Sequence, residues 1–279
     1  AAGAGLDACV LYRGSRIAVV YKPGGVPCHR SSYTGRRQLR DNEPPPLLQQ
    51  ARDLLGSRVN LVHRLDQGAS GMVVVALDED TEATATMVAA LAAGTKTYVA
   101  WCRGSGAPLM AYADGGAATY RSPDGVSHPV TSLGRGWFEV NRTIRDDSGR
   151  EREAVSHFRV LGGVAGECRS CLVAVRPQTG RWHQIRRHLN GLSHPILGDT
   201  THGNGPTNRG WRRRGLQRLA LHLHHLALPA TTVSPALSLS CALPEDVALP
   251  LRTYTSDLVP IVERELPDLL ALPHVDERS

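Results

Sequence analysis

Short runs of β-branched and aliphatic residues, each stopped by glycine, proline or a polar turn, recur along the chain and favour a sheet as its main element. The runs fall at residues 16–21, 72–77, 95–102, 154–161, 168–176 and 218–228. Helical patterns lie among them, at residues 47–55, 78–93, 180–191 and 258–272. Residues 104–150 are expected to form loops and short hairpins, as an insertion, and residues 206–215 a basic loop. Since no linker or repeat interrupts this mixture, we expect residues 1–279 to form one α+β domain.

The charge balance of the chain is compatible with a nucleic-acid partner. Lys and Arg together number 32 against 26 Asp and Glu, and only Lys22 and Lys96 are lysine. Arginine offers a rigid fork of donors for phosphate oxygens, although a genome rich in G and C would also favour arginine. No run of 18 apolar residues occurs, so no membrane partner is expected.

Cysteine and histidine patterns do not predict a metal site. The six cysteines are scattered, unlike a secreted disulfide scaffold, and an intracellular location, in the cytoplasm or an organelle, is therefore expected. Cys168 and Cys171 form a C-x-x-C pair without a second pair at zinc-ribbon spacing. In the strand at 218–228, His222 and His224 share one face and His225 points to the other, and no carboxylate stands at ligand spacing.

Three segments could carry chemistry, and each also has an ordinary structural explanation. His63-Arg64-Leu65-Asp66 precedes a glycine turn and a buried strand, so Asp66 is either a catalytic group on a loop or a turn former. In the predicted helix 180–191, Trp182, Ile185 and Leu189 would share one face, leaving Arg186 near its edge. A partly buried arginine there needs a carboxylate, for which Asp66 is a candidate; a solvated basic face is the alternative.

The third segment is the strand at residues 96–100, with the sequence KTYVA. Tyr98 and Ala100 share one face of that strand, opposite Thr97 and Val99. Tyr98 is either a residue of the site or a tyrosine of the core.

Taken together, these segments resemble the RluA-type family of pseudouridine synthases. Five family motifs occur in order over roughly residues 15–245: HRLDQGASG at 63–71, KTYVA at 96–100, TGRWHQIRRHL at 179–189, HPILGDTTHG at 194–203 and RLALHLHHL at 218–226. Ala69 stands where the family usually has Thr, and Gln67-Gly68 is also unusual. We expect no separate S4-type RNA-binding module.

The resemblance implies a mixed, mostly antiparallel sheet with a central cleft, an RNA substrate and no cofactor. Asp66 would be the essential carboxylate, which either attacks the substrate or takes a ribose proton. Arg186 would pair with Asp66 and keep it ionised, and Tyr98 would stack on the uracil and help to remove its C5 proton. Arg64 would fill the gap that the flipped base leaves.

One sub-branch, the tRNA pseudouridine synthase C type, is the most similar. Its V-H-R-S element after a K-P-x-G turn resembles Cys28-His29-Arg30-Ser31, which follows Lys22-Pro23-Gly24-Gly25 here. It also shares His202, in place of the commoner tyrosine, and Asn208-Arg209. The expected substrate is therefore a tRNA uridine in the acceptor-stem and T-arm half, and the alternatives are ribosomal RNA or an inactive RNA-binding homologue. A monomer is expected, with these candidate RNA-binding residues: Arg64, His29, Arg30, Arg181, His183, Arg212, Arg213 and Arg214.

Overall fold

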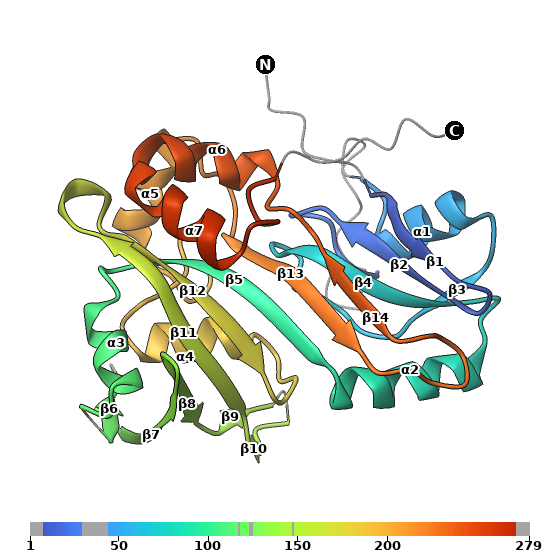
Figure 1. Cartoon of the computed structure of the whole chain (residues 1–279), viewed down its shortest axis with the longest axis horizontal. Helices are drawn as coiled ribbons and strands as arrows, with labels where there is room; N and C mark the ends of the chain where they lie inside the picture. The colour runs from blue at the N-terminus through green and yellow to red at the C-terminus, as the bar shows by residue number, and fades with distance from the viewer. Residues whose placement is uncertain (1–7, 30–43, 117, 123–124, 147, 272–279) are drawn as a thin grey trace.

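The computed structural model describes residues 8–29, 44–116, 118–122, 125–146 and 148–271, and its main feature is one long sheet (Figure 1). The strand order is β1-β2-β4-β13-β5-β12-β11-β8-β7-β6, with β3 paired to β4 and β14 paired to β13. Neighbouring strands run antiparallel except β4 and β13. The expected mixed, mostly antiparallel sheet is thus confirmed.

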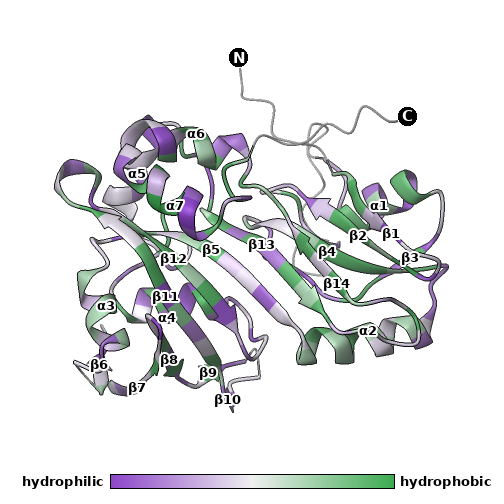
Figure 2. Ribbon diagram, in the orientation of Figure 1, coloured by the Kyte–Doolittle hydropathy of each residue, from purple (hydrophilic) through white to green (hydrophobic). Residues whose placement is uncertain are grey.

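Strands β2, β4, β5, β11, β12 and β13 match the six apolar runs of the sequence closely. The bounds of the strands are β1 Val10–Arg13, β2 Ile17–Lys22, β3 Val59–Leu61, β4 Ser70–Leu77, β5 Thr95–Arg103, β6 Thr119–Arg121, β7 Ser127–Gly134, β8 Trp137–Asn141, β9 Ile144–Arg145, β10 Glu151–Arg152, β11 Val155–Val164, β12 Ser170–Pro177, β13 Leu221–Leu228 and β14 Leu237–Ser240. Every residue of β2 and β4 is buried, and β4 is hydrophobic along nearly its whole length (Figure 2).

Seven α-helices cover the sheet in the described part of the chain. They are α1 Leu47–Leu55, α2 Thr81–Ala93, α3 Ala107–Ala113, α4 Gln184–Gly191, α5 Gly205–Arg213, α6 Glu245–Tyr254 and α7 Val259–Glu265. Strand β11 shows that both faces are covered, because Phe158 contacts α4 through His188 while its neighbour Arg159 pairs with Glu265 of α7. None of the described helices is long and apolar enough to cross a membrane.

The parallel pair β4–β13 lies at the centre of the sheet and brings the HRLD segment there. His222 is in register with Ser70, and the Ser70 Oγ lies 3.0 Å from His222 Nδ1. Gly71 has a φ of +125°, and a Cβ at this position would lie 2.5 Å from the Leu223 carbonyl oxygen. Only glycine allows this approach, so the S-G dipeptide after the HRLD turn fixes where β4 enters the sheet.

Two sequence predictions about helices are wrong. The helix predicted from residue 180 begins only at Gln184, because His183 takes a left-handed conformation with a φ of +53°. Trp182 therefore precedes the helix and is 57% exposed, whereas Ile185 and Leu189 do face the core. The basic segment 206–215, expected to be a loop, contains helix α5, which Asn204 caps by accepting a hydrogen bond from the Thr207 N–H.

Residues 104–150 contain a hairpin, as expected, and also a helix that was not expected. The hairpin β7–β8 extends the sheet, and α3 packs against it. Near the C-terminus, α7 is shorter than the predicted helix 258–272. The sequence analysis missed α6, since Pro250 lies inside that helix and breaks the pattern that predicts one.

Candidate active site

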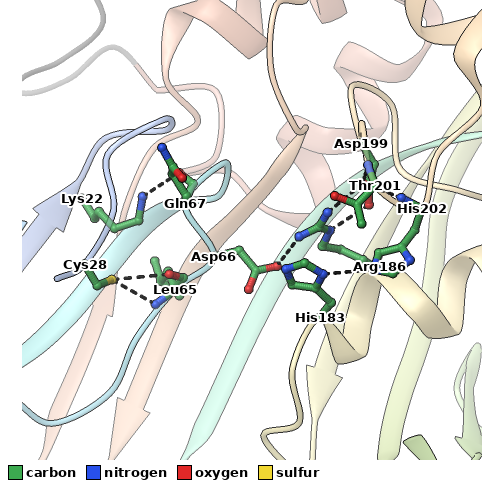
Figure 3. Close-up of polar contacts among 10 residues, drawn as sticks. All are labelled: Lys22, Cys28, Leu65, Asp66, Gln67, His183, Arg186, Asp199, Thr201 and His202. Carbon is green, nitrogen blue, oxygen red and sulfur yellow. Dashed lines mark hydrogen bonds and ion pairs between the residues drawn. The ribbon is translucent and has the colours of Figure 1, made fainter. Parts of the chain in front are cut away.

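Asp66 lies on the loop between β3 and β4, and neighbouring segments hold that loop in place. The buried Lys22 donates hydrogen bonds from Nζ to the carbonyl oxygens of Pro23, Val26 and Gln67, at 2.7, 2.6 and 3.1 Å. Burial lowers the pKa of Lys22 to about 8. On the other side, the Leu65 N–H lies 3.3 Å from the Cys28 Sγ (Figure 3). The Asp66 carboxylate is left 25% exposed.

Arg186, on α4, joins Asp66 to a second carboxylate. Its Nη1 donates to the Asp66 Oδ2 at 3.1 Å, while its Nε and Nη2 donate to both oxygens of Asp199 at 2.8 Å each (Figure 3). The Arg186 side chain is 8% exposed and that of Asp199 is 1% exposed. The bidentate bond to Asp199 fixes the plane of the guanidinium, so that one N–H remains directed at Asp66.

Asp199 is held by a compact turn. Its Oδ1 accepts hydrogen bonds from the backbone N–H groups of Thr201 and His202, both at 2.9 Å. Asn208 joins the turn to α5, because its side chain donates to the Asp199 carbonyl and accepts from the Gly198 N–H. Burial raises the pKa of Asp199, but the bonds from Arg186 and the two N–H groups outweigh this and leave the pKa below its ordinary value.

Three aromatic rings adjoin the ion pair. His183 Nδ1 and His202 Nε2 lie 3.0 Å apart, so one imidazole donates and the other accepts (Figure 3). Burial lowers the pKa of His183 to about 4 and also lowers that of His202. The indole of Trp182 stacks on His183, with ring centroids 3.7 Å apart and planes at 20°.

A cavity of about 540 Å³ contains the Asp66 side chain. Tyr98, from β5, lines it, and burial together with the charge of Asp66 raises the pKa of the Tyr98 phenol. Asp66 and Tyr98 therefore meet in one cavity, as expected. Its other lining residues include Cys28, His29, Arg64, Lys96, Thr179, Arg181, Trp182, His183 and Leu221.

The predicted RNA-binding residues divide between two regions. Arg64, His29, Arg181 and His183 line the cavity, and Arg64 Nη1 lies 3.3 Å from His29 Nε2. Arg30 lies outside the described residues. Arg212 and Arg213 are exposed on the last turn of α5 and do not line this cavity, and Arg214 lies over the Trp211 and Tyr254 rings with a contact to Glu167.

Asp199 and Lys22 are the parts of the site that the sequence analysis missed. Asp199 stood in the HPILGDTTHG motif, and Lys22 follows the apolar run 16–21, but neither received a role. A signal existed for Asp199, because a buried guanidinium has five donors and a single carboxylate cannot satisfy them. Which of several acidic residues supplies the second acceptor depends on the fold.

The histidine-rich strand β13 is engaged in structural hydrogen bonds. His222 Nε2 and His224 Nδ1 each lie 2.9 Å from the Cys241 carbonyl oxygen. Within the part of the chain that the structure describes, no group of three or more His, Cys, Asp or Glu side chains is arranged to hold a metal ion.

Comparison with known proteins identifies relatives of this site and fold. A profile of the RNA pseudouridylate synthase family matches residues 16–191. A tRNA pseudouridine synthase C of Yersinia pestis is 32% identical over 240 residues, which cover 83% of this chain and 84% of that protein. Its counterpart in Vibrio cholerae is 31% identical, covering 78% and 83% of the two chains.

Solved structures share the fold. The human RNA pseudouridylate synthase domain containing 4 superposes with a TM-score of 0.56 at 24% identity, covering 88% of this chain and 92% of that chain. The human domain containing 1 gives a TM-score of 0.55 at 23% identity, with coverage of 84% and 83%.

Proposed function

The chain belongs to the RNA pseudouridylate synthase family, and we propose that it isomerises a uridine of tRNA with Asp66 as the catalytic carboxylate. The observation that carries this proposal is the Asp66–Arg186 ion pair, at 3.1 Å, in the wall of the cavity lined by Tyr98. A carboxylate held by a buried arginine and still reached by solvent is available to a substrate.

The reaction rearranges bonds within one nucleotide. The bond between ribose C1′ and uracil N1 breaks, the uracil turns, and C5 bonds to C1′; the C5 proton leaves and N1 gains a proton. Asp66 either forms a transient bond with the substrate or takes a ribose proton, and both routes begin with an ionised carboxylate. The hydrogen bond from Arg186 Nη1 would hold that carboxylate in one orientation on either route.

Tyr98 is proposed to contact the uracil. Its ring is 9% exposed and lines the cavity beside Asp66, so a base that enters can stack on it. The raised pKa of Tyr98 means that its hydroxyl stays protonated, as a hydrogen-bond donor or a relay for the C5 proton.

The target base must leave its stack to reach Asp66, because the glycosidic bond of a stacked base is inaccessible. Arg64 stands two residues before Asp66 and lines the same cavity, which supports its role in filling the gap left behind. His29, Arg181 and His183, on the same cavity wall, would contact the flanking backbone.

The relatives named tRNA pseudouridine synthase C support tRNA over ribosomal RNA as the substrate. The fold of a single chain brings Asp66, Tyr98 and Arg186 together without a residue from a second copy, which supports a monomer as the acting form.

To test the substrate, the protein is incubated separately with unmodified total tRNA and unmodified ribosomal RNA, and new pseudouridines are mapped. Modification of tRNA is expected. Efficient modification of ribosomal RNA with none in tRNA would overturn the substrate, and no pseudouridine in either RNA would favour an inactive RNA-binding homologue.

A further inference from the structure

Trp182 is a large aromatic side chain exposed beside the cavity. It is 57% exposed, and Tyr254, at 41%, is the other strongly exposed aromatic side chain among the described residues. Trp182 lines the cavity of Asp66 and Tyr98. Exposed apolar surface at a cavity often marks a place where a partner binds.

The Trp182 ring is held in position before any ligand arrives. Its neighbour His183 stacks against it at 3.7 Å, and a hydrogen bond to His202 fixes that imidazole. The left-handed backbone at His183, with a φ of +53°, sets the direction in which Trp182 leaves the chain. A ring fixed in this way loses little conformational entropy when a second ring stacks on it.

Arginine side chains beside Trp182 provide charge for the backbone of the same partner. Arg181 precedes it, donates from Nε to the Glu153 carbonyl at 2.9 Å, and lines the cavity; Arg64 lines it as well. Aromatic rings interleaved with arginines characterise surfaces that bind unpaired nucleotides, where bases stack on the rings and phosphates contact the guanidinium groups.

We propose that Trp182 is a stacking platform for a base next to the target uridine, one that is unstacked together with it. The proposal rests on the function proposed above and adds a second base to it. Tyr98, 9% exposed, would take the target uracil deep in the cavity, and Trp182, 57% exposed, the neighbouring base at the mouth. Trp182 stacks on His183, His183 is hydrogen-bonded to His202, and the His202 N–H donates to Asp199, the partner of Arg186. The proposed platform is therefore connected to the ion pair of the site.

The test compares Trp182→Ala, Trp182→Phe and the control Leu249→Ala, an apolar side chain on α6 that is 60% exposed and does not line the cavity. Affinity for a substrate RNA and steady-state turnover are measured for each. Because one base–aromatic stack is worth about 1–3 kcal/mol, Trp182→Ala should raise Kd and KM by about 5- to 150-fold, with kcat nearly unchanged. Trp182→Phe should restore most of the affinity, and Leu249→Ala should match the wild type.

A second measurement locates the stacked base. Substrate RNAs are made with one abasic nucleotide at each position flanking the uridine. At one flanking position, the abasic nucleotide should weaken binding by the wild type about as much as Trp182→Ala weakens binding of intact RNA. The same abasic RNA should bind Trp182→Ala only slightly more weakly than intact RNA does. Unchanged affinity of Trp182→Ala, or equal abasic losses in both proteins at every position, would overturn the platform.

The two proposals fail in different ways. RNA affinity tests the role of Trp182 even if no pseudouridine forms. If the wild type forms pseudouridine and Trp182→Ala binds RNA equally well, the stacking proposal is wrong and the proposed isomerase function stands.

Discussion

At the scale of single residues, Arg186 has the largest consequences. Its side chain is 8% exposed and pairs with two carboxylates, one of which, Asp199, is almost wholly buried. Its removal would leave the Asp199 charge inside the protein with two backbone N–H groups as its remaining partners. Arg186 therefore links the stability of the fold to the orientation of Asp66.

Arg186→Ala should lower both activity and stability far more than Arg187→Ala. Breaking a buried ion pair from one side costs about 3–5 kcal/mol, whereas Arg187 makes a partly exposed hydrogen bond to the Arg145 carbonyl and its loss should cost less than about 1 kcal/mol. Urea unfolding and pseudouridine formation are measured for both variants. Equal effects of the two substitutions would contradict the pairing.

The Asp66–Arg186 contact could be predicted from the sequence, but only in part. The helical spacing of Ile185 and Leu189 placed Arg186 at the edge of a buried face, where it needs a carboxylate. Asp66 was a candidate for that partner, 120 positions away in sequence, and the family motifs favoured it. The same spacing misled for Trp182, because no local pattern reveals that His183 is left-handed. Asp199 was not predicted, because the number of donors on Arg186 does not indicate which acidic residue accepts their hydrogen bonds.

At the scale of elements, β13 is held between β4 and β5 by polar as well as apolar contacts. His222 lies between the Ser70 hydroxyl and the Cys241 carbonyl, accepting from one and donating to the other. Burial lowers the pKa of His222 to about 3, and the hydrogen bond to Cys241 opposes this shift without cancelling it.

His222 should make the protein less stable as the pH falls. The unfolded chain takes up a proton at His222 below about pH 6.5, whereas the folded protein does so only near pH 3. The free energy of unfolding therefore decreases progressively as the pH falls through that interval. His222→Gln retains one donor and one acceptor without titrating. Its unfolding free energy should therefore depend less steeply on pH between about 6 and 4. Burial also lowers the pKa of His225, a half-buried residue on the same strand, but less far, so His225→Gln should flatten the slope less than His222→Gln. Identical slopes for wild type and His222→Gln would refute the assignment.

The basic segment that includes α5 contains packed side chains as well as exposed charges. Trp211 packs edge-on against Trp101 with ring centroids 4.4 Å apart, and Arg214 lies over Trp211. Arg212 and Arg213 are left exposed. The sequence could not show which of these arginines packs on a ring and which are exposed, because Arg212, Arg213 and Arg214 are consecutive.

Neutralising Arg212 and Arg213 together should weaken RNA binding equally for all sequences. Each phosphate contact contributes a slope of about 0.7–0.9 to log Kobs against log salt, so the slope should flatten by up to about two units. The control replaces two exposed arginines outside the α5 segment, Arg135 in the β7–β8 turn and Arg150 in the β9–β10 turn. An unchanged affinity and slope would leave Arg212 and Arg213 as solvated surface charges.

At the scale of the whole molecule, the strand content could be predicted but the strand order could not. The apolar runs located β2, β4, β5, β11, β12 and β13 well, because buried strands have a strong local pattern. The insertion of β13 between β4 and β5 depends on contacts between segments far apart in the chain, such as Ser70 and His222. This insertion creates the cavity, since it sets the loop of Asp66 beside Tyr98 on the central strands.

The central claim is that this fold presents Asp66 for the isomerisation of uridine. The direct measurement is pseudouridine mapping in one unmodified tRNA after incubation with the wild type or with Asp66→Asn, with circular dichroism and RNA binding recorded for both proteins. Because Asp66 lies on a loop and is 25% exposed, the substitution should leave folding and binding largely intact. The account predicts pseudouridine with the wild type and none detectable with Asp66→Asn; appreciable conversion by the well-folded variant would contradict it.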